Sequence, residues 1–355
     1  MSVLQPSSSP SSNNISSTSI ADLRLQEIQQ WLLSLDTIPT LLPTIRPASA
    51  DASFRRYFRI DVASGGTLII MDAPQPQEDV RPFIFVADLF GKAGMSVPQI
   101  LAQDVERGFL LLTDLGPTTY LEKLRNDTAD HMYLQAIDTL VKMQTHSKPD
   151  VLPEYDRAFL LRELHIFPEW YLGKHLNAVL TPAQSTSLQQ VFDALLANNM
   201  AQPQVYVHRD YHSRNLMVLP DGSPGVLDFQ GALYGPITYD LASLLRDVYI
   251  RWEEEQVLDW VIRYWERAKR AGLPVAPDID TFYRDFEYMG LQRHLKILGL
   301  FARLHHRDGK AAYLNDIPQV LEYVRKTSLR YRELIPLVRL LDTLEAKPQQ
   351  VGYTF

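Results

Sequence analysis

The chain has 355 residues, a formal net charge of −7 and no cysteine. This length predicts two domains or one large two-lobed domain, with enough buried surface for a core of its own. The lack of cysteine excludes disulfides, thiolate metal sites and cysteine nucleophiles, and it fits a reducing, cytoplasmic compartment. The mild acidity argues against a nucleic-acid-binding protein. No apolar run approaches the roughly 20 residues that a membrane span needs.

Residues 1–19 differ from the rest of the chain in composition. They contain nine serines, two prolines and no charged residue. Such a segment cannot bury enough apolar surface to order itself, so the sequence predicts a disordered head. It has neither the basic start and apolar core of a secretory signal nor the arginines of a transit peptide. A docking tail is the alternative interpretation.

The region 20–114 is predicted to be a small, strand-rich N-lobe. It opens with a helix whose apolar residues recur at steps of three and four, from Leu25 to Leu35. Strand pairs follow, each joined by a short turn. The predicted strands are 54–62 with 67–71 and 97–103 with 108–113, and a helix is predicted at 82–92.

The character of the sequence changes after Gly116-Pro117, and 115–355 is predicted to be a larger, helical C-lobe. Helical patterns dominate it, apart from a short apolar strand at 205–207 and one embedded hairpin. The predicted helices are 128–147, 157–176 and 182–198, with further helices nearly to the C-terminus. The whole is therefore an α+β protein of two unequal lobes.

The hairpin carries the first candidate site. Asp221-Gly222 lies between apolar runs and predicts a two-residue turn. A register centred on that turn places Asn215 opposite Asp228, with Cβ atoms about 5 Å apart. An amide oxygen and a carboxylate at the open end of a ribbon suit Mg²⁺, which keeps its other positions for water and substrate phosphates.

Asp210 adds a second carboxylate just upstream. It lies in His208-Arg209-Asp210, directly after the predicted strand 205–207, and should reach the same end of the ribbon. A carboxylate beside a metal-bound phosphate can orient an acceptor hydroxyl and take its proton as the new bond forms. His-x-Asp, an Asn five residues later and an Asp thirteen residues further on are together specific enough to predict phosphoryl transfer.

The stretch from His208 to Asn215, followed by 226–229, resembles the catalytic loop and metal-binding aspartate of kinases. Because a second histidine stands at His212, it is most similar to the aminoglycoside phosphotransferase and choline kinase family. The segment 235–242 resembles that family's next motif, whose aspartate, here Asp240, supports the catalytic loop.

The resemblance implies a two-lobed, protein-kinase-like fold with ATP in the cleft, the N-lobe binding nucleotide and the C-lobe binding the acceptor. It implies that Asp210 is the catalytic base and that Asn215 and Asp228 are magnesium ligands. By the same resemblance, His208, His212 and Asp240 are scaffold residues.

Within that family the chain looks most like the anomeric sugar kinases of bacterial cell-wall recycling, which phosphorylate N-acetylmuramate and N-acetylglucosamine at C1 with ATP. The similar segments are Asp51–Phe58, Met71–Pro74, Phe167–Tyr171 and Asp228–Ala232. This resemblance implies an ATP-dependent sugar kinase of peptidoglycan recycling.

The nucleotide site departs from the kinase pattern. No glycine-rich loop precedes the second strand, so backbone N–H groups with Ser53 and Arg55 or Arg56 are expected to hold the phosphates. The alternative is that both arginines are solvated strand charges. Met71 stands where kinases carry a phosphate-pairing lysine. Either an arginine replaces that lysine, or the protein is a nucleotide-binding pseudokinase.

Two further features concern regulation and the nucleotide. Gln230 replaces the glycine of the protein-kinase motif, which argues against an activation-loop switch. The adenine contact is expected in the linker near Thr113 and Asp114, where backbone groups do the recognition; both could also be plain turn residues.

The charge of one C-terminal segment bears on which acceptor the protein would bind. The segment 293–310 holds five lysines and arginines and three histidines against one acid, and would attract a carboxylate or phosphate and repel an aminoglycoside. Arg293 and Lys296, one helical turn apart, are candidates for the lactyl carboxylate of N-acetylmuramate, and a solvated basic face is the alternative. Trp170 is a candidate for stacking on a sugar or on a choline cation, unless it belongs to the core. Glu163 either accepts sugar hydroxyls or pairs with Arg162 or another neighbour.

Two other functions stay open on the residues alone. The same chemistry could serve choline, a thiosugar, homoserine or an aminoglycoside. A pseudokinase would bind nucleotide and a partner without turnover. In every case the expected ligands are ATP and a small molecule, with no nucleic acid and no membrane.

Overall fold

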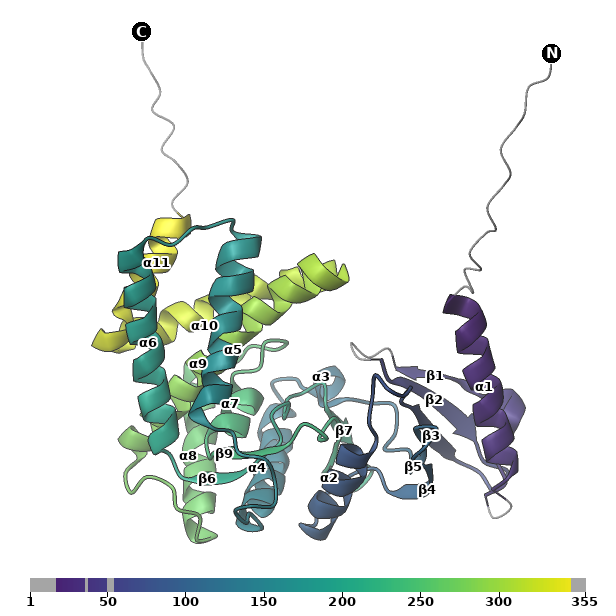
Figure 1. Cartoon of the computed structure of the whole chain (residues 1–355). Helices are drawn as coiled ribbons and strands as arrows, with labels where there is room; N and C mark the ends of the chain where they lie inside the picture. The colour runs from purple at the N-terminus through teal and green to yellow at the C-terminus, as the bar shows by residue number, and fades with distance from the viewer. Residues whose placement is uncertain (1–16, 36–37, 50–53, 346–355) are drawn as a thin grey trace, which may run out of the picture. The chain divides into compact units, whose positions relative to one another are not determined.

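In the computed structural model of the protein, the residues described are 17–35, 38–49 and 54–345 (Figure 1). They form two compact units. The first takes in the described residues up to Arg81 together with Gln99–Asp114, and the second takes in Pro82–Pro98 and the described residues from Leu115 onward. Of the predicted head, 1–16 lie outside the described residues, and 17–19 are helical rather than disordered because α1 begins at Ser17.

The first unit is an antiparallel sheet with one helix packed on it. The strand order is β1-β2-β3-β5-β4. The apolar stripe of α1, with Ile28 and Trp31, packs on side chains from three strands, among them Ile70 and Phe109. The elements are α1 (Ser17–Leu33), β1 (Arg46–Ser49), β2 (Arg56–Asp61), β3 (Thr67–Asp72), β4 (Ile100–Asp104) and β5 (Phe109–Thr113), with a short 3₁₀ turn at Leu42–Thr44. The sequence did not predict β1.

The segment 82–98, predicted as part of the N-lobe, belongs to the second unit. It contains most of α2 (Arg81–Lys92), whose buried face includes Phe83 and Phe90. Both rings pack against Phe229, at centroid distances of 4.8 and 6.1 Å. The apolar face of α2 therefore contacts the segment directly after Asp228, and this contact groups 82–98 with the second unit.

The second unit is mainly helical and contains two short antiparallel ribbons, β6 with β9 and β7 with β8. Its helices are α3 (Tyr120–Lys123), α4 (Ala129–Thr145), α5 (Arg157–Ile166), α6 (Pro182–Ala201), α7 (Tyr239–Leu245), α8 (Glu254–Arg270), α9 (Ile279–Asp308), α10 (Ile317–Arg330) and α11 (Ile335–Glu345), with 3₁₀ turns at Ala311–Asp316 and Arg332–Leu334. Its strands are β6 (Gln204–Val207), β7 (Leu216–Val218), β8 (Pro224–Val226) and β9 (Leu233–Pro236).

The predicted helix 157–176 is two elements. The α-helix α5 ends at Ile166 and a π-helical segment, η2 (Phe167–His175), continues the chain. Pro168 has no N–H to donate to the α-helical ladder, which accounts for the change of winding. The long helix α9 approaches this junction closely: a Cβ on Gly299 would lie 2.4 Å from the Ile166 carbonyl, so the contact requires glycine.

None of the helices within the described residues is long and apolar enough to cross a bilayer.

Candidate active site

The loop after β6 is held by a buried carboxylate. The backbone N–H groups of His208 and Arg209 donate to the two oxygens of Asp240, at 2.6 and 2.9 Å. Asp240 is buried in the first turn of α7, and that burial raises its pKa to about 7, against the opposing effect of the two hydrogen bonds. The arrangement fixes the backbone immediately before Asp210.

His208 joins this loop to the strand that leads to Asp228. Its Nε2 lies 3.0 Å from the carbonyl of Leu227, and its Nδ1 accepts from the backbone N–H of Asp210 at 3.2 Å. Burial lowers the pKa of His208 to about 4, so the ring is neutral at physiological pH. The two contacts require the tautomer with hydrogen on Nε2. A neutral histidine therefore links Asp210 to the neighbour of Asp228.

The hairpin of β7 and β8 has a register one residue away from the predicted one. Leu216 pairs with Val226 rather than with Leu227, and the N–H of Leu227 donates to the carbonyl of Asn215 at 2.9 Å. The turn is longer than predicted, because Gly222 N–H donates to the carbonyl of Leu219. The loop thus has three residues, with glycine in the left-handed region at φ +82°.

Asn215 and Asp228 nevertheless converge. Asn215 Nδ2 lies 3.5 Å from Asp228 Oδ2 and donates to the carbonyl of Asp210 at 2.9 Å. Asp228 has φ +61°, a conformation that aspartate tolerates better than most residues. Gln230 Nε2 donates to the other oxygen of Asp228 at 2.5 Å. The structure therefore brings together the predicted carboxylate of Asp228 and amide of Asn215, and joins them to the backbone of Asp210.

The Asp210 carboxyl lies in a field of positive charge. Burial alone would raise its pKa, but Lys296, His212, Arg293 and Arg209 outweigh that effect and hold the pKa below its usual range. Asp210 is thus ionised at neutral pH, which is the state in which it can accept a proton.

Glu163, predicted as an acceptor-binding residue, makes its hydrogen bonds within the protein. Its Oε1 pairs with Arg209 Nη2 at 2.7 Å and with Lys296 Nζ at 3.0 Å, and its Oε2 accepts from the Tyr155 hydroxyl. Lys296 also donates to the Tyr239 hydroxyl at 3.2 Å. These contacts agree with the second interpretation of Glu163, in which it pairs within the protein. The partners are Arg209 and Lys296.

The other two predicted acceptor residues differ in exposure. Arg293 is buried, with 5% of its surface exposed, and its Nη1 has no hydrogen-bond partner within the described part of the chain. Trp170 is half-buried in the π-helical segment η2. Arg293 is therefore a buried charge near Asp210, and its Nη1 donates no hydrogen bond to the described residues.

In the first unit, the predicted nucleotide residues pair with acids. Arg55 lies 3.0 Å from Glu78, and Arg56 Nε donates to Asp72 at 2.8 Å. Arg24 pairs with the same aspartate. Met71, next to Asp72, is fully buried, so two arginines converge beside the position where kinases carry lysine.

The remaining predicted nucleotide residues lie at the end of β5, except for Ser53, which is outside the described residues. Asp114 pairs with Arg59 at 2.5 Å and accepts from the Thr67 hydroxyl at 2.6 Å. The Thr113 hydroxyl accepts from the backbone N–H of Gln99 at 2.8 Å. Both side chains thus join the end of β5 to neighbouring segments of the sheet.

Comparison with known proteins gives the family. Residues 44–273 match the model of the phosphotransferase enzyme family. The chain belongs to this family. The matched range includes Asp210, Asn215, Asp228 and the supporting Asp240. The protein is therefore a phosphotransferase, and ATP is the co-substrate that the family implies.

Curated relatives of this phosphotransferase match nearly its whole length. It is 52% identical over 313 residues to the N-acetylmuramate/N-acetylglucosamine kinase of Neisseria meningitidis serogroup B, covering 87% of this chain and 93% of the relative. It is 46% identical to the protein of the same name from Pseudomonas putida, over 92% of this chain and 98% of the relative.

Solved structures show the fold. The choline kinase LicA from Streptococcus pneumoniae is 12% identical, with a TM-score of 0.62 over 86% of this chain and 99% of that one. An amicoumacin kinase is 15% identical, with a TM-score of 0.59 over 87% and 96%. The predicted two-lobed, kinase-like α+β fold is confirmed.

The structure adds residues near Asp210 that sequence reasoning missed. The guanidinium of Arg214 lies 3.5 Å from the ring centroid of Tyr249, and that ring also contacts His212. Asp247 accepts from the backbone N–H of Ser213 at 3.0 Å and also from its hydroxyl. The short spacing of Ser213 and Arg214 from Asp210 was a signal, but no motif pointed to Asp247 or Tyr249.

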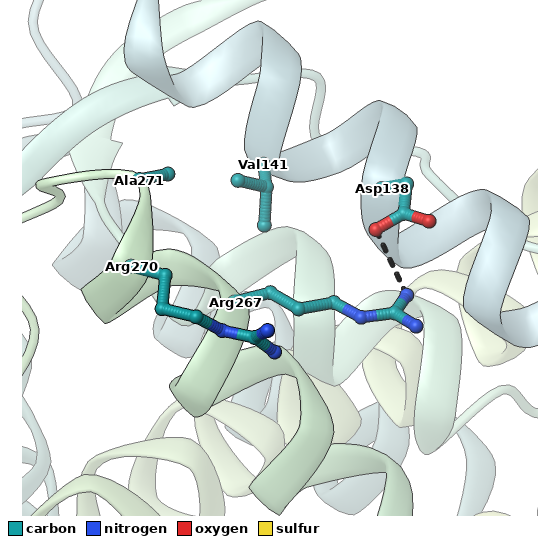
Figure 2. Close-up of a pocket in the computed structure, with 5 residues that line it drawn as sticks. All are labelled: Asp138, Val141, Arg267, Arg270 and Ala271. Atoms are coloured by element: carbon teal, nitrogen blue, oxygen red, sulfur yellow. Dashed lines mark hydrogen bonds and ion pairs between the residues drawn. The ribbon is translucent and has the colours of Figure 1, made fainter.

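A separate surface pocket lies between α4 and α8 and contains none of the predicted site residues (Figure 2). Asp138 and Arg267 form an ion pair of 2.8 Å across it. The remaining lining residues are Val141, Arg270 and Ala271. The lining contains one acid, already paired, and nothing that resembles a second catalytic centre.

Proposed function

We propose that this phosphotransferase transfers the γ-phosphoryl group of ATP to the anomeric hydroxyl of N-acetylmuramate and N-acetylglucosamine, in peptidoglycan recycling. The observation that carries the proposal is the 52% identity to a kinase named for these two sugars, over 87% of this chain and 93% of the relative. Because ATP is the donor, we place the reaction in the cytoplasm.

The proposed chemistry uses three side chains of the second unit. The oxygen of the C1 hydroxyl attacks the γ-phosphorus while Asp210 accepts its proton. The bond from the γ-phosphorus to the bridging oxygen breaks, and ADP leaves with that electron pair. The ionised state of Asp210 and its tethering through His208 support this role.

Asn215 and Asp228 are the proposed ligands of Mg²⁺, and the donor set fits that ion. An amide and a carboxylate lie side by side, and magnesium sites in kinases use one or two carboxylates plus phosphate oxygens. No cluster of three or more acidic or histidine side chains suited to a metal occurs among the described residues. The bound ion would neutralise charge on the phosphates, and the nucleotide would have to complete its coordination.

For the nucleotide we propose Ser53, Arg55 and Arg56 at the phosphates and the backbone around Thr113 and Asp114 at the adenine. The convergence of Arg24 and Arg56 on Asp72 supports an arginine in place of the missing lysine. The pairing with the buried Asp72 fixes the orientation of the Arg56 guanidinium.

The proposal is tested by measuring ATP-dependent ADP formation with a panel of acceptors. We expect turnover with N-acetylmuramate and N-acetylglucosamine, and values of kcat/KM at least 10²-fold lower with choline, homoserine and an aminoglycoside, because a site built for hydroxyls and a carboxylate leaves its polar groups unpaired with other acceptors. Phosphorus NMR should place the new phosphate on C1. A preference for choline or phosphorylation at another hydroxyl would contradict the proposal.

At the acceptor, Arg293 is the proposed partner of the lactyl carboxylate, and Trp170 the proposed sugar-stacking residue. Lys296 and Glu163 are occupied with each other, and they contribute to the acceptor site through charge rather than through open hydrogen-bond positions. Arg293, by contrast, has a buried Nη1 that makes no hydrogen bond with any of the described residues.

Arg293→Gln is expected to act on one sugar and spare the other. Loss of a charge-assisted contact with the carboxylate costs about 1.5–3 kcal/mol, or roughly 10- to 100-fold in kcat/KM for N-acetylmuramate. N-acetylglucosamine has no carboxylate, and Asp210 keeps the charges of Lys296 and Arg209 near it, so kcat/KM for this sugar should change less than about threefold. Arg307→Gln is the matched control, because Arg307 lies on the same helix, is exposed and pairs with Asp308. Equal losses on both sugars would exclude a role in recognising the carboxylate.

A further inference from the structure

Arg209, the residue before Asp210, has an uncommon backbone conformation. Its φ is +78°, in the left-handed region that a side chain with Cβ rarely adopts. Such a conformation is strained and persists only where surrounding contacts hold it. The contacts of Arg209 therefore decide whether the loop keeps the shape that presents Asp210.

The Arg209 side chain is held on several sides within the second unit. Its guanidinium lies over the rings of Tyr155 and Phe159, 5.7 and 5.2 Å from their centroids. Its Nη1 donates to the carbonyl of Gly231 at 3.4 Å, in the segment after Asp228. Its guanidinium also forms an ion pair with Glu163, at 2.7 Å.

Glu163 holds two cations with a single carboxylate. It lies on α5 with 6% of its surface exposed, and it pairs with Arg209 and with Lys296 of α9. Burial opposes its ionisation, but the charges of Lys296 and Arg209 keep the pKa of Glu163 below its ordinary value. Lys296 also donates to the hydroxyl of Tyr239 at 3.2 Å, on the helix α7 that carries the loop-supporting Asp240. One buried anion thus fixes the neighbour of Asp210 and a cation that contacts α7.

We propose that Glu163 is a positioning residue for phosphoryl transfer, which acts by anchoring Arg209 and Lys296 so that Asp210 is held in its productive orientation. This inference rests on the proposed function, in which Asp210 is the base.

The test compares Glu163→Gln, Glu163→Asp, Arg209→Gln and the double variant Glu163→Gln/Arg209→Gln with the wild type, using ATP and N-acetylglucosamine. An amide of the same shape cannot balance two cations, and loss of orientation at a catalytic group costs about 10²-fold. We expect Glu163→Gln to lower kcat by about that factor, with KM for ATP changed less than threefold. Glu163→Asp keeps the charge and should recover part of kcat. The double variant should be no slower than Glu163→Gln, because both changes break the same link.

Glu287→Gln is the matched control. Glu287 is a carboxylate on α9 with 2% of its surface exposed, paired with Arg330 and with the Tyr331 hydroxyl. It lacks contact with the loop, so its loss should lower the melting temperature with kcat unchanged in the folded enzyme.

The outcomes separate this inference from the proposed function. If Glu163→Gln keeps wild-type kcat, or if Glu287→Gln lowers kcat to the same extent at equal loss of melting temperature, the positioning role is overturned. If the double variant multiplies the losses of the single ones, the anchor through Arg209 is overturned. A wild-type enzyme without activity on any amino sugar would overturn the proposed function instead.

Discussion

Asp210→Asn is expected to lower kcat by about 10²- to 10⁴-fold, the range that a positioned general base contributes. The amide cannot take the proton of the attacking hydroxyl, yet the backbone contacts stay the same. Asp210 N–H still donates to His208 Nδ1, and its carbonyl still accepts from Asn215 Nδ2. Steady-state kinetics with N-acetylglucosamine measures kcat, and calorimetric titration of a non-hydrolysable ATP analogue measures nucleotide binding. We expect binding within about threefold of the wild type.

The control for this variant is Asp221→Asn. Asp221 lies exposed at the tip of the same hairpin, where it accepts from the backbone N–H and hydroxyl of Ser223, and an asparagine oxygen can accept these bonds too. The charge change is identical, so any general effect of removing one negative charge appears in both. If Asp210→Asn turned over within about threefold of the wild type, another group would have to accept the proton.

Asp228→Asn is expected to remove most of the dependence of nucleotide binding on magnesium. Asparagine tolerates the positive φ of this position and can still accept from Gln230, so the backbone should be retained. The amide has no charge with which to attract Mg²⁺, and we expect kcat to fall by at least about 10²-fold. The apparent affinity for Mg²⁺ in activity assays should fall in parallel.

A readout independent of turnover is the affinity for the ATP analogue with and without magnesium. In the wild type we expect tighter binding with Mg²⁺, and in Asp228→Asn nearly equal values. Asp221→Asn should behave as the wild type. A variant whose nucleotide binding still tightened with Mg²⁺ to the wild-type extent would contradict the assignment of Asp228 as a ligand.

Much of the site could be predicted from the sequence because the chemistry lies in a short, contiguous segment. The hairpin was predicted correctly and its register was not. The two-residue turn predicted at Asp221-Gly222 requires a positive φ at both residues. Only Gly222 has a positive φ. Pro220 precedes this pair, and its fixed φ favours the first central position of an ordinary type I turn, which adds one residue to the loop. The positive φ of Asp228 then returns its side chain towards Asn215.

The contacts around Glu163 could not be predicted in the same way. They join Glu163 of α5 to Arg209, which lies 46 residues later in the loop after β6. They also join Glu163 to Lys296 of α9, still farther along the chain. No periodicity or motif relates those positions, since each helix reads as an ordinary amphipathic element. Because Glu163 and Lys296 pair with each other, both are interpreted as members of a fixed ion pair rather than as contacts to the acceptor.

The grouping of α2 with the second unit affects how the chain can be divided. The polypeptide crosses between the units after Arg81, after Pro98 and after Asp114, so no single cut releases either unit whole. A fragment that starts at Leu115 would lose Phe83 and Phe90 and expose the ring of Phe229, which is fully buried in the intact chain. That ring directly follows Asp228. Dissection of this enzyme therefore has to keep 82–98 with the catalytic segment, as a separately expressed peptide or by circular permutation.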